Sequence, residues 1–431
     1  MLCSVLSYEL FHVPIHSDVV YPNASAEIFE EAQRHSVTPL LYPALRGCAV
    51  LSGNVQDEQL AALRRTALYS AQRFEAVLRC QAGLLALLQG IPCAVLKGMS
   101  IACTYPHAEL RVPGDIDILV QEADIERVGR ILSANGYTYT HETDLHTCFV
   151  KSLPDGMTID IEMHVAVSLF PDTEKGIFTS TFMSDALHHT KMQEINGLLF
   201  PALSGVYQLI ALLSHMERHL MVLGIGLRQM CDWAAAVHAQ RGEIGQDDLD
   251  TLKRCGLLQF AKVCTRLCEK YLGLPELSWS GGVSEDEVDA LFRDVMESGD
   301  FHAQCSVRPL ISNMTDGYDV DDKGSSFLRS YLTCIRRRVR EDYPWTVKQR
   351  GTHNAADTNG SDAGSCGSGH GGGIAANVQV NVFWVGVFAV FYPVRYVFGM
   401  LRGKRKKVDV HQAVAEARSR ERMLRGLEIY K

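Results

Sequence analysis

The chain has 431 residues, of which 47% are hydrophobic and 21% charged, and its 42 Lys and Arg against 50 Asp and Glu give a net charge of −8. This composition suits globular domains with ample core material and excludes a collagen-like chain, a wholly disordered chain and a polytopic membrane protein. A net negative charge also argues against nucleic-acid binding through a broad basic surface. The 13 cysteines show no CxxC spacing and the N-terminal segment has no early Lys or Arg. We therefore expect reduced thiols, no signal peptide and a cytoplasmic location.

Residues 1–90 are predicted to form a helical N-terminal region. Apolar residues recur there at intervals of three and four, which is the spacing of one helix face: Leu60, Leu63, Leu68, Phe74, Val77, Leu78, Leu84 and Leu87. No group suited to catalysis stands out in this region, so we expect it to pack against or cover another domain.

Residues 91–199 change to short alternating elements, which predicts a mixed α/β core. Apolar and polar residues alternate in two segments, which we expect to be strands with one exposed face. The expected elements in chain order are a strand at 93–96, a Gly-Ser turn with a helix start at 97–100, a strand at 114–120, a helix at 123–135 ended by Gly136, and strands at 137–141, 145–151 and 158–164.

Residues 200–345 are predicted to form a mainly helical C-terminal domain. Two apolar stripes at helical spacing carry this prediction: Leu209, Leu212, Leu213, Met216 and Leu220, then Leu227, Met230, Ala234 and Val237. Glycine, serine and small polar residues dominate 351–377, which indicates a flexible linker.

The tail at 378–431 combines an apolar run at 380–392 with a basic cluster at 403–407. As a helix the run would span only about 20 Å, short of a hydrocarbon core of about 30 Å. The alternatives are a helix packed back on the protein, a helix on an anionic membrane surface, or a true membrane span. A surface helix would place the protein at the periphery of an inner membrane.

The chemistry is concentrated in acidic residues on two predicted strands. Asp115 and Asp117 are two residues apart, so they share one strand face with Cα atoms roughly 6.6 Å apart. Such a pair suits two divalent ions at roughly 3.5–4 Å separation, and carboxylate ligands favour Mg²⁺ or Mn²⁺. Asp160, Glu162 and His164 share a face of the second strand. If the strands are neighbours, Glu162 or Asp160 adds a third carboxylate.

A glycine turn precedes the acidic pair. Gly98 allows the backbone to approach a phosphate, and the helix that follows would point N–H groups at the anion. Ser100 could donate its hydroxyl, and Lys97 and Arg111 could neutralise the charge of departing pyrophosphate. These residue types fit a triphosphate.

Together these motifs resemble the bacterial nucleotidyltransferase-like family of the DNA polymerase β superfamily, a poorly characterised branch. The resemblance covers roughly 35–275 and depends on the following segments: Leu96-Lys97-Gly98, Tyr105, Arg111, the run from Gly114 to Val120, Gly136-Tyr137, Glu162-Met163-His164, the run from His215 to His219, and the run from Gly226 to Asp232. Neither the LKG segment nor the GDIDILV segment would be specific alone.

The resemblance implies a polymerase-β-like mixed sheet flanked by helical regions. It also implies that Asp115 and Asp117 hold the metal, with Glu162 as the third acid and Asp160 as its competitor. Apart from the resemblance, the residues that we expect to bind the nucleotide are Lys97, Gly98, Ser100, Arg111 and Gly114. Residues expected to line or support the substrate pocket are His164, His215, His219, Arg228 and Asp232. For His215 and His219 the alternatives are helix–helix hydrogen bonding and a zinc site, although HMERH is not the HExxH motif. For Arg228 and Asp232 the alternative is an ion pair within one helix.

The resulting hypothesis is a Mg²⁺-dependent nucleotidyltransferase that moves a nucleoside monophosphate from an NTP, such as ATP, to an unknown acceptor. That acceptor could be a small molecule, a peptide, a protein or an RNA. A non-enzymatic nucleotide-binding or scaffold protein is the main alternative, although an acidic cluster without metal is costly to keep. A toxin-type nucleotidyltransferase acting on tRNA or protein differs only in its acceptor.

Overall fold

The computed structural model describes residues 2–15, 25–47, 57–143, 146–167, 174–222, 224–300, 347–348, 379–380 and 419–429. The chain divides into one unit of residues 1–308 and 418–431 and a second unit of residues 309–417. In the second unit the described residues are β8 (Val347–Lys348) and β9 (Gln379–Val380), which pair antiparallel. The predicted linker and apolar run, apart from those β9 residues, lie outside the described residues, as does the basic cluster.

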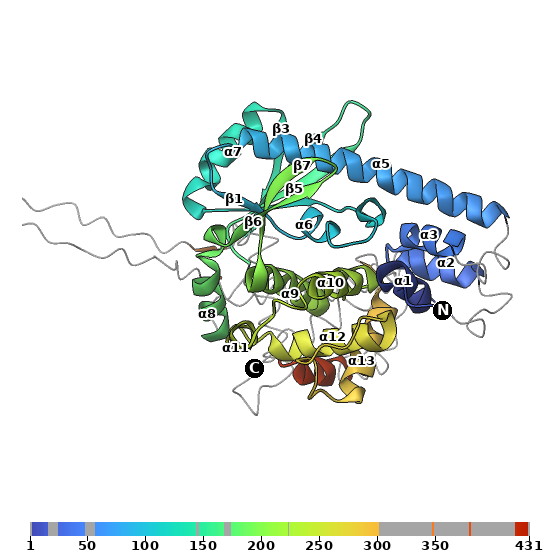
Figure 1. The fold of residues 1–431 in the computed structure, drawn as a ribbon. Coiled ribbons are helices and arrows are strands. Elements are labelled where there is room, and N and C mark those ends of the chain that lie inside the picture. The colour runs from blue at the N-terminus through green and yellow to red at the C-terminus, as the bar shows by residue number, and fades with distance from the viewer. Residues whose placement is uncertain are drawn as a thin grey trace, which may run out of the picture. The chain divides into compact units, whose positions relative to one another are not determined.

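The first unit is built on a seven-stranded mixed sheet with strand order β3-β4-β5-β2-β1-β7-β6 (Figure 1). Parallel pairs join β2 to β5 and β1 to β7, and the other neighbours are antiparallel. The strands are β1 (Cys93–Val95), β2 (Ile116–Val120), β3 (Tyr137–Glu142), β4 (His146–Ser152), β5 (Thr158–His164), β6 (Thr190–Ile195) and β7 (Leu198–Leu203). The predicted mixed-sheet α+β fold with flanking helices is therefore confirmed.

Helices cover both faces of this sheet. They are α1 (Leu2–Phe11), α2 (Ser25–Arg34), α3 (Leu41–Gly47), α5 (Asp57–Leu87), α6 (Met99–Ala102), α7 (Ile125–Ala134), α8 (Glu174–Met183), α9 (Gly205–Val222), α10 (Leu227–Ala239), α11 (Gln246–Arg254), α12 (Leu258–Leu272) and α13 (Glu285–Ser298). Short 3-10 helices lie at Thr38–Leu40, Ala108–Leu110, Glu122–Asp124 and Ala186–His188. Both predicted apolar stripes at 209–220 and 227–237 are buried.

The two faces of β2 belong to different cores, because successive side chains of a strand alternate. Ile116 and Ile118 pack in one core with Phe74 of α5 and Val128 of α7. Leu119 packs in the other core, which contains apolar residues of α1, α9, α10 and α12. Figure 1 shows α5 and α7 on one side of the sheet and α9 and α10 on the other.

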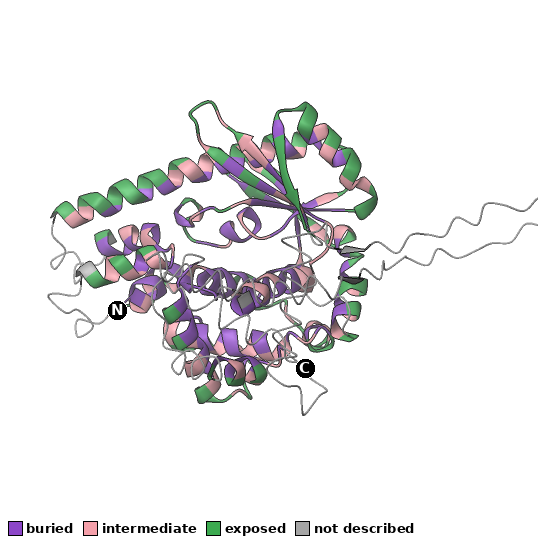
Figure 2. Ribbon diagram, turned by 180° about the vertical axis from the view of Figure 1, so that it is seen from behind, coloured by how far each residue is buried: buried purple, intermediate pink, exposed green. Residues whose placement is uncertain are grey.

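This double cover corrects one prediction about β2. The alternation at 114–120 predicted a strand with one exposed face, but all five residues of β2 are buried. The second face is covered by the helical layer that contains α10, which is itself buried over almost its whole length (Figure 2). The polar residue Asp117 is therefore interior, with 2% of its surface exposed.

The N-terminal region is helical as predicted, and its longest helix, α5, packs on one face of the sheet. Phe74, Val77 and Leu84 of this helix are buried against strand residues in one core. The helical spacing placed Leu68 on the same apolar face. This prediction is wrong, because Leu68 is 55% exposed. The first half of α5 thus presents more surface to solvent than its periodicity indicates.

Residues 419–426 form a helix in the first unit, shown in red in Figure 1. Leu424 and Leu427 have no exposed surface and join the core that contains α9, α10 and α12. Arg420 lies 3.2 Å from Asp294 of α13 and also donates to the carbonyl of Leu220. Residues 419–429 are therefore part of the folded first unit. Among the described residues no helix is both long and apolar enough to cross a membrane.

Candidate functional site

The predicted carboxylates meet at the junction of β2 and β5. These strands are parallel neighbours, and Asp117 is paired in register with Glu162. Asp115 lies just before β2, not within it, and its side chain still reaches the same cluster. One carboxylate oxygen from each of Asp115, Asp117 and Glu162 lies within 4.8 Å of the others. Three hard oxygen donors at this separation fit a divalent cation such as Mg²⁺.

Two positive or polar groups currently contact the most buried acid. Lys97 Nζ is 2.7 Å from Asp117 Oδ1, and His164 Nε2 is 2.8 Å from the same oxygen. His164 also lies 3.1 Å from Glu162 Oε2. Burial opposes ionisation of Asp117, but Lys97 and His164 hold its pKa well below the ordinary value. The two carboxylates in turn raise the pKa of His164 despite its burial.

Asp115 experiences the opposite balance. Burial and the neighbouring charge of Asp117 raise the pKa of Asp115 from 3.8 to about 6, and the opposing effect of Lys97 is smaller. Like charges that are partly withdrawn from water repel each other unless a cation joins them. The electrostatics of the cluster therefore agree with its donor set, since a bound divalent ion would remove this penalty.

The glycine turn lies beside the acids as predicted, with an unusual backbone. Both Lys97 and Gly98 have positive φ values, 32° and 50°. Such a conformation is rare for a residue with a side chain, and Lys97 has it while its ammonium group contacts Asp117. The backbone N–H of Leu96 also donates to the carbonyl of Asp117 at 2.9 Å, which ties the turn to β2.

Ser100 occupies a different environment from the one expected. Its side chain donates to the carbonyl of Lys97 at 2.9 Å, and the residue is 1% exposed. The carbonyl of Ser100 accepts from Gln208 Nε2 of α9 at 3.2 Å. The structure thus uses this hydroxyl to close the turn, and α9 fixes the turn from the other side.

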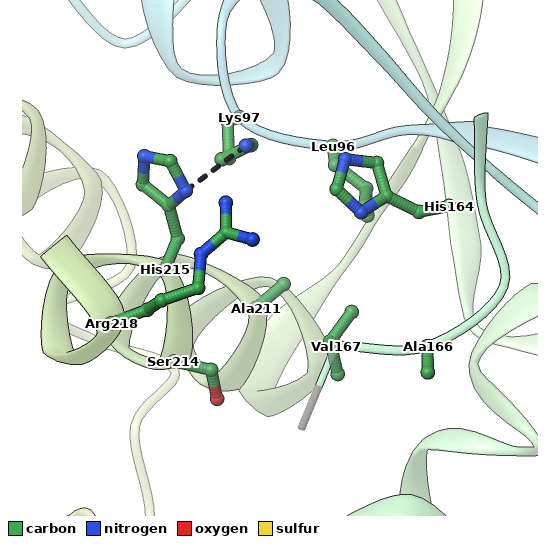
Figure 3. A pocket seen from close by; sticks show the side chains of 9 residues that line it. All are labelled: Leu96, Lys97, His164, Ala166, Val167, Ala211, Ser214, His215 and Arg218. Atoms are coloured by element: carbon green, nitrogen blue, oxygen red, sulfur yellow. Dashed lines mark hydrogen bonds between the residues drawn. The ribbon is translucent and has the colours of Figure 1, made fainter. Parts of the chain in front are cut away.

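A pocket adjoins the acidic cluster between the sheet and α9 (Figure 3). Its wall includes Lys97 and His164, both of which contact Asp117. The other lining residues are Leu96, Ala166, Val167, Ala211, Ser214, His215 and Arg218. The residues from α9 follow helical spacing and so share one face. The periodicity of 211–218 was visible in the sequence, but nothing in it distinguished this face from a core face.

His215 meets the predicted site directly. Its Nδ1 lies 3.0 Å from Lys97 Nζ, which makes it the acceptor of a hydrogen bond from the ammonium group (Figure 3). Burial and the charge of Lys97 hold the pKa of His215 well below its ordinary value, so the ring is neutral. His219 lies next to His215 with ring centroids 4.3 Å apart. Burial and the charge of Arg218 lower its pKa to about 3.

Three predicted residues form buried or partly buried ion pairs away from the cluster. Arg111 donates two hydrogen bonds to Asp232, at 2.7 and 2.8 Å, and Tyr105 donates to the same carboxylate at 2.7 Å. Arg228 pairs with Asp300 at 2.7 and 3.1 Å. The alternative of an ion pair between Arg228 and Asp232 within α10 is therefore wrong. Asp232 pairs with Arg111 and Arg228 pairs with Asp300, and both of these partners come from outside α10 and bind in a bidentate manner.

Two further predicted residues lie at the margin. Asp160 is on the expected face of β5 but is exposed, and among the described residues it is not part of the acidic cluster. Its partner across the sheet is Val150 of β4, whereas Glu162 faces Asp117 of β2. This register favours Glu162 as the third acid. Gly114 is exposed just before Asp115 and has open space around its Cα.

Sequence reasoning missed His146. In β4 it pairs in register with His164, and its Nε2 lies 3.7 Å from Glu162 Oε1. Burial lowers the pKa of His146 to about 4. It stands in a strand expected from 145–151, but only the antiparallel pairing of β4 with β5 brings it to the acids. Arg218 was missed for a similar reason.

A model of the family described as uncharacterised nucleotidyltransferase matches residues 23–273. The chain belongs to this family, and the match spans the sheet, the acidic cluster and α9. The predicted family resemblance is thereby confirmed, and membership supports general nucleotidyl transfer. Searches of curated proteins and of solved structures gave no match. The bacterial origin implied by the resemblance stays a prediction.

Proposed function

We propose that the protein is a Mg²⁺- or Mn²⁺-dependent nucleotidyltransferase. It would transfer a nucleoside monophosphate from an NTP to an acceptor hydroxyl or amine and release pyrophosphate. The observation that supports this most is the convergence of Asp115, Asp117 and Glu162 within 4.8 Å, beside a pocket walled by Lys97. Family membership supplies the reaction class.

Asp115, Asp117 and Glu162 would hold the metal. When bound, divalent ions stabilise the negative charge that develops on the transferred and leaving phosphates. For its metal-binding role Asp117 must exchange its contact with Lys97, which lies 2.7 Å away. The ammonium group of Lys97, which lines the pocket, would then be available to the phosphates of a nucleotide bound there.

The bond changes define what the remaining residues must do. The acceptor oxygen or nitrogen forms a bond to the α-phosphorus, the bond to the bridging oxygen of pyrophosphate breaks, and pyrophosphate leaves with that electron pair. The acceptor loses one proton, and the carboxylate of Glu162 is our candidate to receive it. His164 would orient Asp117 and Glu162, since it contacts both.

The test is label transfer. Purified protein is incubated with each α-³²P-labelled NTP, Mg²⁺ or Mn²⁺, and a cell extract, and both labelled product and released pyrophosphate are measured. We expect wild type and the control variant Asp160→Asn to transfer label, because Asp160 lies outside the cluster. The double variant Asp115→Asn, Asp117→Asn should be inactive. Equal labelling by that double variant would refute the enzyme hypothesis, and nucleotide binding without turnover would support a scaffold.

A further inference from the structure

Arg111, Arg218 and Arg228 all lie on or near segments expected to support the site, and two of these three guanidinium groups are paired with carboxylates. Arg111 is paired with Asp232, and Arg228 is paired with Asp300. Both pairs are bidentate, the first buried and the second partly buried, so these guanidinium groups are already occupied within the protein. Arg218 differs: in the described part of the chain no carboxylate lies within 4.0 Å of its guanidinium nitrogens.

The position of Arg218 makes this difference meaningful. It lies on α9 three residues after His215 and lines the same pocket as Lys97 and His164. Figure 3 shows its guanidinium group rising from α9 into the space between His215 and His164, on the side of Lys97. The residue is half-buried. A cation partly withdrawn from water without an anionic partner is unfavourable, and an anionic ligand would offset that cost.

The neighbouring side chains that the structure describes do not supply this anion. His215 and His219 are held neutral, chiefly by burial and then by the positive charges of Lys97 and Arg218. Lys97 itself is bound to Asp117. The α9 side of the pocket is therefore positive or neutral, opposite the acidic cluster on β2 and β5.

We propose that Arg218 binds the terminal phosphates of the nucleoside triphosphate, the part that leaves as pyrophosphate. The inference rests on the proposed function and names the residue that neutralises its leaving group. A guanidinium group presents two parallel N–H donors to a phosphate, which favours phosphate over other anions. Arg218 would keep this contact when the bond to the α-phosphorus breaks and the electron pair remains on pyrophosphate.

Equilibrium binding tests this without requiring turnover. Binding of ³²P-pyrophosphate in the presence of Mg²⁺ is measured by equilibrium dialysis for wild type, Arg218→Gln, Arg218→Lys and the control Arg130→Gln. Arg130 is 73% exposed on α7, which packs on the opposite face of the sheet. We expect Arg218→Gln to weaken binding by about 10-fold or more, because charge-assisted bidentate bonds are lost.

The second variant separates charge from folding. Arg218→Lys keeps the charge but loses the fork, so its affinity should fall between wild type and Arg218→Gln. Arg130→Gln should bind as wild type does. Thermal unfolding curves of all four proteins identify any variant that fails to fold. If Arg218→Gln does not fold, the pyrophosphate affinity of Arg218→Lys is compared with that of wild type instead.

Two results would overturn the inference. The first is unchanged pyrophosphate affinity in Arg218→Gln; if label transfer to one acceptor is lost at the same time, Arg218 contacts a phosphate of that acceptor instead. The second is absence of pyrophosphate binding by wild type. If wild type transfers no label but Arg218→Gln still weakens pyrophosphate binding, the proposed function fails and the phosphate site stands.

Discussion

Replacing Asp115 with asparagine should stabilise the metal-free protein at neutral pH and also abolish nucleotidyl transfer. The pKa of Asp115 is raised from 3.8 to about 6 by burial and by Asp117. A folded-state pKa above the unfolded value means that the folded protein holds its proton longer as pH rises. Stability is therefore lost between about pH 4 and pH 6, and the loss is complete at pH 7.

The magnitude follows from the size of that shift. About two pKa units at 1.36 kcal/mol each give about 3 kcal/mol of destabilisation at neutral pH. Partial exposure of Asp115 screens the charge, so this figure is an upper bound. Asn keeps the shape of the side chain without the charge. We expect Asp115→Asn to gain up to about 3 kcal/mol at pH 7.5 and almost nothing at pH 4.

The corresponding substitution of Asp117 should change the stability in the opposite direction. Asp117→Asn removes the charge that pairs with Lys97 and His164 and leaves the buried ammonium without its carboxylate. Breaking a buried ion pair from one side typically costs about 3–5 kcal/mol. Asp160→Asn, on the exposed end of the same face of β5, should leave stability unchanged.

Urea denaturation followed by circular dichroism measures these differences, with EDTA at pH 7.5 and at pH 4. Mg²⁺ added at pH 7.5 should stabilise wild type and leave Asp115→Asn nearly unchanged, because only a ligand that binds the folded state stabilises it. A destabilised Asp115→Asn at pH 7.5, or a gain that persists at pH 4, would refute the electrostatic explanation of the cluster.

Three further substitutions test the packing that holds the site. Asp232→Asn should lower the free energy of unfolding by about 3–5 kcal/mol, because it leaves the buried guanidinium of Arg111 without its carboxylate. Urea denaturation measures this loss, and a change near zero would contradict a buried pair. Leu427→Ala should cost about 2–5 kcal/mol, because this C-terminal side chain is fully buried, and a change near zero would remove the C-terminal helix from the core. Gly226→Ala should lower the melting temperature, because a Cβ there would lie 2.9 Å from the backbone nitrogen of Asp300. An unchanged melting temperature would contradict that close approach.

The sequence by itself determined the elements between residues 93 and 164 and the first two acids, but it did not predict β6 and β7. Alternation in 158–164 and the turn at 97–100 both appear where local pattern put them, since strand and turn preferences depend on neighbouring residues. The two-residue spacing of Asp115 and Asp117 predicted that their side chains would lie on one side of the chain, and both join the cluster although Asp115 lies just before β2.

Only the tertiary structure decided which distant residues join these acids. The parallel register of β2 with β5 puts Glu162, and not Asp160, opposite Asp117. The packing of α9 on the sheet brings His215 to Lys97 and Arg218 into the pocket. Such contacts depend on strand order and helix packing between distant parts of the chain, 118 positions apart for Lys97 and His215, which periodicity of 2 or 3.6 residues does not encode.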